Sequence, residues 1–206
     1  MNYTVPNVGV MSSTGLTETQ LSTLLQVLVV QCLGIDPSED ANAYARVRID
    51  WPVPGQPGFT IADDVAFIRA TEEAEPYNMA HEVQVAEASV AGGYAEQTVS
   101  TRVWSVNLIF YGPNSFDRAR QAKSCLYQDF VHDALAQSSL YLVTTIGTPR
   151  RAPELFANQW WPRVDFSFRM YEQVTDSLTK PSVDSIEVVI ADADGNSRDF
   201  IVQQEN

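Results

Sequence analysis

The feature that most constrains the fold is a strand that runs, through a short turn, directly into a helix. Residues 98–111 alternate between apolar and polar side chains, and one face carries Trp104, Val106, Leu108 and Phe110. Alternation with a period of two is typical of a strand that buries one of its faces. Gly112-Pro113-Asn114 then ends the strand, since these residue types favour turns. We therefore expect a half-buried strand at the centre of a β-sheet.

Two helices are predicted. Residues 115–137 place apolar side chains at spacings of three and four, which is the pattern of a helix with one buried face. Residues 17–34 show the same pattern nearer the amino end. Thr17 and Gln20 have the spacing of a capping box there, and Gly34 is expected to end that helix.

Further strands are expected around this strand–helix pair. Short alternating or apolar runs bounded by turn residues predict five of them: residues 45–51, 59–61, 65–69, 140–146 and 161–171. Residues 71–94 are rich in alanine and glutamate and are interpreted as a long excursion from the core. Near the carboxyl end, residues 185–190 and 198–202 flank a turn sequence, which predicts a β-hairpin.

Together these elements predict an α+β fold: a mixed, mainly antiparallel β-sheet packed by two amphipathic helices, with a C-terminal β-hairpin extension. A chain of 206 residues is long enough for one domain with a sizeable core. We expect three parts, namely an extended N-terminal arm over residues 1–15, an α/β domain over residues 16–175 and the hairpin extension over residues 176–206.

The charge balance limits the kinds of partner. Acidic residues number 26 against 13 basic ones, which gives a net charge of −13. Such a surface repels phosphate, so DNA is expected to pass by without specific binding. The longest apolar run, residues 24–33, is much shorter than the ~20 residues that a membrane span needs. With no signal peptide in view, we expect a protein that is soluble and cytoplasmic when made.

The two cysteines, Cys32 and Cys125, lie among apolar residues in the two predicted helices. A free cysteine in that setting packs like a small hydrophobic side chain. Without a CxxC pair or a histidine cluster, neither a zinc site nor a disulfide scaffold is expected. A bridge between the two is the alternative, although cytosolic proteins usually keep their thiols reduced.

No catalytic motif is present in the sequence. It contains no P-loop, no GxGxxG and no GxSxG, and its histidines, His81 and His132, are isolated. A metal-dependent phosphodiesterase could use carboxylates in or beside strands, for which the candidates are Asp50, Asp63, Asp64 and Asp165. The interpretation that we favour is a solvated polar sheet face. We therefore predict no enzymatic activity, no catalytic residues, no metal and no cofactor.

Two stretches of sequence carry a family resemblance. The first is TRVWSVNLIFYG at residues 101–112, followed by Asp117 and the alanine-containing helix, and the second is NQWWPRVDFSF at residues 158–168. The step from a strand through Phe-Tyr-Gly into a helix, and the later Arg-x-Asp-x-x-Phe strand, resemble the tail-terminator or neck proteins of long-tailed phages. The resemblance covers residues 16–174 and includes the order of the elements.

The resemblance implies a structural virion protein of the tail or neck. Such a protein would form a homohexameric ring at the head-proximal end of the tail tube, end polymerisation of the tube and join the tail to the head. Its implied partners are other copies of itself, the tail tube protein and a head-completion or connector protein. A head-completion or connector ring is the alternative function.

Some residues are candidates for these contacts. Acidic side chains that could face the lumen of a ring are Asp63, Asp64, Glu72, Glu73 and Glu75. Trp160 stands beside a second tryptophan just before a predicted strand, and exposed aromatic and arginine side chains are enriched at interfaces. Trp160, Arg150 and Arg151 are therefore candidate interface residues.

Deletion of residues 182–206 should leave a folded α/β domain and weaken assembly, because the hairpin is expected to reach a neighbouring subunit. Unfolding followed by circular dichroism and mass measurement in solution would test this. Loss of cooperative unfolding in the shortened chain would instead place the hairpin in the core.

Overall fold

The computed structural model describes residues 11–49, 58–87, 93–181, 185–191 and 197–203. The chain divides into two compact units. The larger unit consists of Gly15–His81 and Ser100–Val174, and the smaller one of the described parts of Met1–Thr14, Glu82–Val99 and Thr175–Asn206. The predicted three-part division of the chain stays a prediction.

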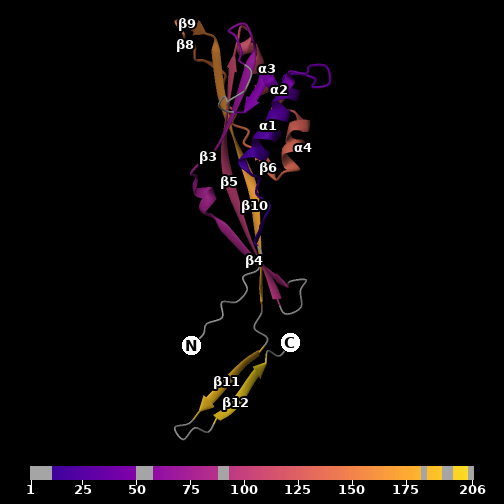
Figure 1. The fold of residues 1–206 in the computed structure, drawn as a ribbon, viewed down its shortest axis with the longest axis vertical. Helices are drawn as coiled ribbons and strands as arrows, with labels where there is room; N and C mark the ends of the chain where they lie inside the picture. Colours follow the sequence, from indigo (N-terminus) through magenta and orange to yellow (C-terminus); the bar gives the residue numbers. More distant parts are fainter. Residues whose placement is uncertain (1–10, 50–57, 88–92, 182–184, 192–196, 204–206) are drawn as a thin grey trace. The chain divides into compact units, whose positions relative to one another are not determined.

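The larger unit is built on a mixed, mainly antiparallel sheet, as predicted (Figure 1). Its strands follow the order β10 (Arg163–Pro181), β5 (Gly93–Tyr111), β3 (Val65–Glu72) and β2 (Val47–Ile49). The pair β3–β5 is antiparallel and β2–β3 is parallel. Two short strands, β6 (Leu140–Leu142) and β7 (Arg150–Arg151), pair with β10. Both β5 and β10 also contribute residues to the smaller unit.

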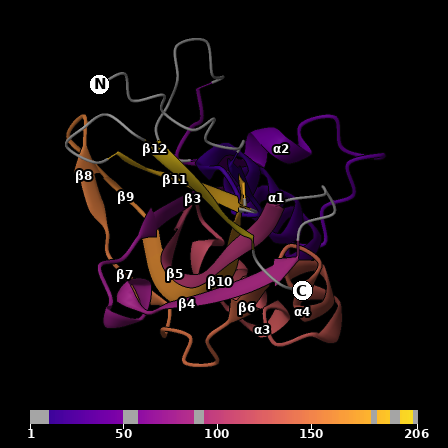
Figure 2. The ribbon, with the colours of Figure 1, turned by 90° about the horizontal axis from the view of Figure 1, so that it is seen from below.

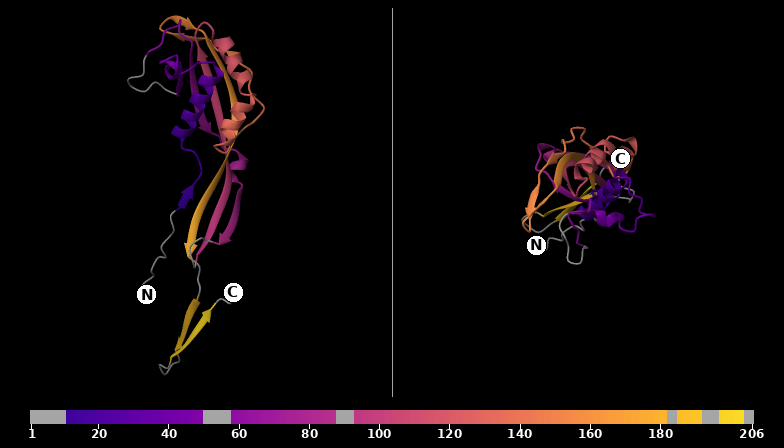
Figure 3. Two further views of the ribbon diagram at one scale, coloured as in Figure 1. Left: turned by 90° about the vertical axis from the view of Figure 1, so that its right-hand side faces the viewer. Right: turned by 90° about the horizontal axis from the view of Figure 1, so that it is seen from above.

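Helices cover one face of this sheet (Figures 1 and 3). They are α1 (Glu18–Cys32), α3 (Ser115–Cys125) and α4 (Asp129–Ala136), whereas the short α2 (Ala43–Arg46) directly precedes β2. The alternating face of β5 lies in the core, as its pattern predicted, and Trp104 is 6% exposed. The buried core joins both layers through Leu21, Leu25, Leu28, Val29, Val106, Leu108, Phe110, Ala119, Ala122, Val131, Leu135, Phe166, Phe168 and Met170.

The predicted ends of α1 are confirmed. The Thr17 side chain accepts a hydrogen bond from the backbone N–H of Gln20, and the Gln20 side chain accepts one from the backbone of Thr17. This reciprocal pair satisfies N–H groups that have no partner within the helix. Beyond the other end, Gly34 adopts φ +65°, the left-handed conformation that glycine takes most easily.

The second predicted helix is broken, so a single helix over residues 115–137 is wrong. The chain leaves α3 after Cys125, and Gln128 takes an extended conformation before α4 begins. The break rotates the buried face, because α4 buries Val131 and Leu135 while Phe130 stays 45% exposed. Periodicity alone did not show this, since the apolar spacing continues across the break.

Other boundaries also differ from the predictions. Ala43–Arg46 is helical, so only Val47–Ile49 of the strand expected at residues 45–51 is observed, and Trp51 lies outside the described residues. Residues 60–63 form a turn instead of a strand. The Ala/Glu-rich stretch is partly regular structure: η1 (Pro76–Met79), a 3-10 helix, and β4 (His81–Glu87), which pairs with β5.

The regular structure described in the smaller unit consists of paired strands. β1 (Met11–Ser13) pairs antiparallel with residues 176–178 of β10. The predicted C-terminal hairpin is confirmed, since β11 (Ser185–Ala191) and β12 (Ser197–Gln203) pair antiparallel from Ser185 opposite Gln203 to Ala191 opposite Ser197.

The structure pairs Cys32 with Cys125, which corrects the expectation of two free thiols. The two Cα atoms are 5.3 Å apart and join the last residue of α1 to the last residue of α3. Sequence spacing could not show this, because 93 residues separate the two positions and only helix packing brings them together.

The Cys32–Cys125 bridge should stabilise the protein by about 2–4 kcal/mol, because it restricts a long loop in the unfolded chain. Denaturant unfolding with and without reductant would measure this. The Cys32→Ala/Cys125→Ala variant is the control, and its unfolding should not respond to reductant. Identical curves for oxidised and reduced wild-type protein would contradict the expected contribution.

Candidate functional site

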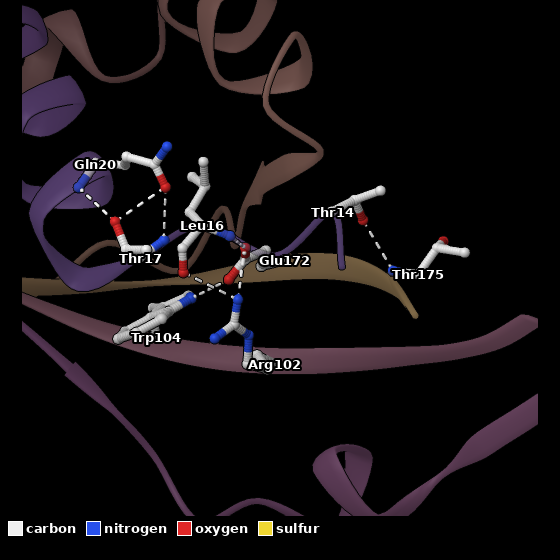
Figure 4. A network of polar contacts seen from close by, with 8 residues as sticks. All are labelled: Thr14, Leu16, Thr17, Gln20, Arg102, Trp104, Glu172 and Thr175. Carbon is white, nitrogen blue, oxygen red and sulfur yellow. Dashed lines mark hydrogen bonds and ion pairs between the residues drawn. The ribbon is translucent and has the colours of Figure 1, made fainter. Parts of the chain in front are cut away.

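A buried carboxylate, that of Glu172 on β10, organises the polar contacts inside the larger unit (Figure 4). Glu172 is 1% exposed. Its Oε1 accepts hydrogen bonds from the backbone N–H of Leu16 at 2.6 Å and from Arg102 Nη2 at 2.9 Å. Its Oε2 accepts one from Trp104 Nε1 at 2.7 Å. Arg102 Nη2 also donates to the carbonyl of Leu16 at 3.1 Å.

Both carboxylate oxygens of Glu172 thus accept hydrogen bonds from other groups of the fold. The network joins the segment before α1 to β5 and β10, because Leu16, Arg102 and Glu172 come from those three places. A buried charge requires a partner and further hydrogen bonds to offset its lost hydration, and this carboxylate has both. We therefore assign Glu172 a structural role.

The face of the sheet opposite the helices carries an ion-pair cluster around Arg163. Its guanidinium binds Asp165 at 2.8 Å and Glu154 at 3.1 Å, and the Tyr111 hydroxyl donates to Glu154 at 2.6 Å. Burial and this hydrogen bond raise the pKa of Tyr111 to about 12. The same hydrogen bond and the nearby Arg163 guanidinium lower the pKa of Glu154, against an opposing effect of burial. The two carboxylates of the cluster are thus both paired with the Arg163 guanidinium.

Aromatic rings fix a β-hairpin beside this cluster. The hairpin consists of β8 (Glu154–Phe156) and β9 (Gln159–Trp161), and its turn residues Ala157 and Asn158 both have positive φ. The Trp161 ring meets Phe59 at 5.4 Å and Phe156 at 5.9 Å between centroids. Trp161 therefore points inward, while its neighbour Trp160 is 63% exposed.

One face of this hairpin is exposed and apolar: it carries Leu155 and Trp160, which lie opposite each other in the strand pair. Leu155 and Phe156 are also more than half exposed. A groove beside them is lined in part by Arg151, Pro153 and Trp160. The structure thus brings two of the three predicted interface candidates, Arg151 and Trp160, to one groove. Arg150 lies opposite Asp165 in the ladder, so its side chain is on the other face of the sheet from that of Arg151. The sequence gave no indication of the hairpin that adds Leu155.

The five acidic candidates do not form one group. Asp63 and Asp64 precede β3. Asp63 accepts hydrogen bonds from the backbone and side chain of Thr60, which lower its pKa. The Asp64 carboxylate binds the backbone N–H of Asn114 at 3.0 Å and its side-chain amide at 2.8 Å, where the chain enters α3.

The other three acids lie at or beyond the opposite end of β3. Glu72 is the last residue of that strand and is exposed. Glu73 and Glu75 both bind the Arg169 guanidinium, at 2.8 and 3.0 Å. The two groups of acids are therefore separated by the length of β3.

The remaining predicted candidates are dispersed. Asp165 is bound by Arg163, His81 is in β4 and His132 is in α4, and Asp50 lies outside the described residues. No group of three or more potential metal ligands occurs within the part of the chain that the structure describes. In that same part, no helix has both the length and the apolar character that crossing a bilayer requires.

Glu172 is the important residue that sequence reasoning missed. A signal for it was present, because Glu172 continues the row formed by Phe166, Phe168 and Met170 on the buried side of β10. An acidic residue in phase with a buried apolar row indicates a buried, partnered carboxylate.

The buried charge of Glu172 joins parts of the fold, and the β8–β9 hairpin exposes apolar side chains. Sequence comparison gives the class of the protein. Residues 19–198 match the family described as phage neck terminator protein, and the chain belongs to that family. It is thus a structural protein of the phage neck. No curated protein matches the chain.

Glu172→Ala should lower the free energy of unfolding by about 3–5 kcal/mol, because it removes one partner of a buried ion pair and leaves the Trp104 N–H without its acceptor. Denaturant unfolding would measure the loss. Asp133→Ala, which removes an exposed carboxylate on α4, is the control and should change stability by less than about 0.5 kcal/mol. Equal effects of the two substitutions would contradict the structural role of Glu172.

Proposed function

We propose that this protein forms a ring, most simply a homohexamer, at the head-proximal end of the phage tail tube. There it ends polymerisation of the tube and joins the tail to the head and neck. The observation that carries the proposal is the family match over residues 19–198, which spans most of the chain. The proposed partners are other copies of the chain, the tail tube protein and a head-completion or connector protein.

The distribution of exposed side chains supports a role in assembly. Trp160 and Leu155 lie opposite each other on the exposed face of a hairpin whose base is held by Trp161. Contiguous exposed apolar side chains are typical of protein interaction sites. A hairpin fixed at its base loses little conformational freedom on binding, which favours association.

We further propose that acidic side chains line the path of DNA through the ring. The candidates lie at both ends of β3: Asp63, Asp64, Glu72, Glu73 and Glu75. A channel that runs along this strand would therefore present acids near both of its ends. Like-signed charge on the wall and on the phosphates would keep DNA from adhering as it passes.

The proposal is tested with the purified chain and the tail tube protein of the same phage. Electron microscopy should show the chain as a ring at one end of each tube, and capped tubes should not lengthen when more tube protein is added. Adding the chain before or after tube growth should give short or long tubes, respectively.

Two results would contradict this function. A chain that stays monomeric both alone and with tail tubes does not form the proposed ring. A ring that binds isolated head connectors and ignores tube ends would instead be a head-completion or connector protein.

A further inference from the structure

We propose that copies of this chain are joined by strand addition, in which the C-terminal hairpin β11–β12 of one copy pairs with the edge of β4 in the next copy. The edge in question is the one that faces away from β5. This inference rests on the proposed ring and identifies the strands that would join its subunits. The binding surface is the backbone of β4, and its occupant is a second copy of the chain.

The first observation is that β4 is an edge strand. Among the described residues it pairs with β5 and with no other strand, so one of its two edges has no strand beside it. Such an edge presents a row of backbone N–H and C=O groups that can pair with another chain. Because β4 has seven residues, this row is longer than that of the three-residue strands β1, β2 and β6.

The side chains of β4 give this edge little protection. Natural proteins guard exposed edges with proline, lysine or a covering segment. The strand contains neither proline nor lysine, and Val83 and Val85, on one face of it, are 58% and 65% exposed. Its acidic residues, Glu82 and Glu87, lie towards its two ends. The edge is therefore suited to strand addition, in which main-chain hydrogen bonds supply the affinity.

The second observation is that the hairpin forms a sheet of its own. In the described chain β11 and β12 make a two-stranded sheet, and they lie side by side in Figures 1 and 2. A two-stranded hairpin alone is marginally stable in water, and three or more strands are needed for independent stability. Each of its strands has seven residues, as β4 has, so the hairpin can extend another sheet along the whole of β4.

The register of the hairpin places most of its apolar residues on one face. Of the six positions on that face, one is Arg198 and the other five are apolar: Ile186, Val188, Ile190, Phe200 and Val202. Val83 and Val85 give β4 an apolar face as well. Apolar side chains on adjacent strands contact each other across the ladder. Addition of the hairpin with these two faces on the same side would shield part of each.

The connection to the hairpin favours a neighbouring copy as its source. In the strand order β10–β5–β4, a strand added to β4 lies three strand spacings, roughly 14 Å, from β10. Only residues 182–184 join β10 to β11, and that connection spans at most about 14 Å when fully extended. No length remains for a path around β5 and β4. The hairpin of another copy is free of this restriction, because its β10 belongs to a different sheet.

Strand addition of this kind also suits a ring. Each copy gives a hairpin and receives one, so the contact joins two different surfaces. A repeated contact between different surfaces closes into a ring when the rotation between neighbours permits. In a closed ring every β4 edge is paired, which removes the tendency of such an edge to aggregate.

Cross-linking between single cysteines tests the contact. The substitutions Cys32→Ala/Cys125→Ala first remove the two native thiols. One such chain then carries Val85→Cys in β4, and a second, with a different tag, carries Val188→Cys in β11 or Phe200→Cys in β12. After mixing, reassembly and treatment with a short bis-maleimide, at least one of the two mixtures should contain differently tagged chains linked to each other. Each chain treated alone should stay unlinked.

A matched control uses an exposed position outside the proposed contact. Asp133→Cys on α4 takes the place of Val85→Cys, and the same mixtures should then give no linked chains. Circular dichroism and thermal unfolding verify that each variant is folded, and light scattering verifies that it assembles.

Hydrogen exchange provides a second measurement that needs no substitution. In assembled wild-type protein the backbone amides of β4 should exchange on the order of tenfold or more slowly than in the dissociated chain, because strand addition gives them partners. A chain that lacks residues 182–206 should not gain this protection at any concentration.

The outcomes separate this inference from the proposed function. If wild type assembles while the β4 amides stay unprotected and no hairpin cysteine links to Val85→Cys, the ring stands and the inference is wrong. Links between two Val85→Cys chains would show that β4 edges pair with each other, which also overturns it. Protection of β4 that requires tail tube protein would make that protein the source of the added strand. If wild type is monomeric alone and with tubes, the proposed ring fails, and this inference with it.

Discussion

The carboxylate of Glu172 holds together parts of the larger unit that are far apart in sequence. It accepts hydrogen bonds from the segment before α1 and from two side chains of β5, while its own backbone belongs to β10. Removing a charge from water is costly unless the charge is paired and its oxygens are hydrogen-bonded. Glu172 has all of these partners only when the segment before α1, β5 and β10 are packed together. The network therefore favours one position of α1 on the sheet. Since α1 supplies much of the layer that covers the sheet, the core depends on this contact.

The turn from β5 into α3 is the second constraint, and it also depends on a carboxylate. Gly112 has φ +107°, and a Cβ at this position would meet the backbone of Asp63 and the side chain of Asp64. Asp64 in turn binds Asn114 through two hydrogen bonds. The turn from β5 into α3 is therefore held by the loop that precedes β3. Asp64, a candidate for the lumen, thus also has a structural role.

The two faces of the sheet differ in what they contact: one is buried against the helices, and the other supports an exposed hairpin. One face is covered by helices, whereas the other holds ion pairs and aromatic rings that support the β8–β9 hairpin. Adjacent tryptophans face opposite ways, because successive side chains of a strand alternate. Trp161 anchors the hairpin and Trp160 is left for a partner.

The sequence alone determined the features that depend on local pattern: the buried face of β5, the capping box of α1, the C-terminal hairpin, the α+β class and the family resemblance. Only the tertiary structure decided the break between α3 and α4, the Cys32–Cys125 bridge and the burial of Glu172. It also separated the five acids and brought Arg151 and Trp160 to one groove, with Arg150 on the other face of the sheet. The physical reason is that periodicity reports which face of an element is apolar, whereas pairing of charges, sulfurs and rings depends on residues distant in sequence.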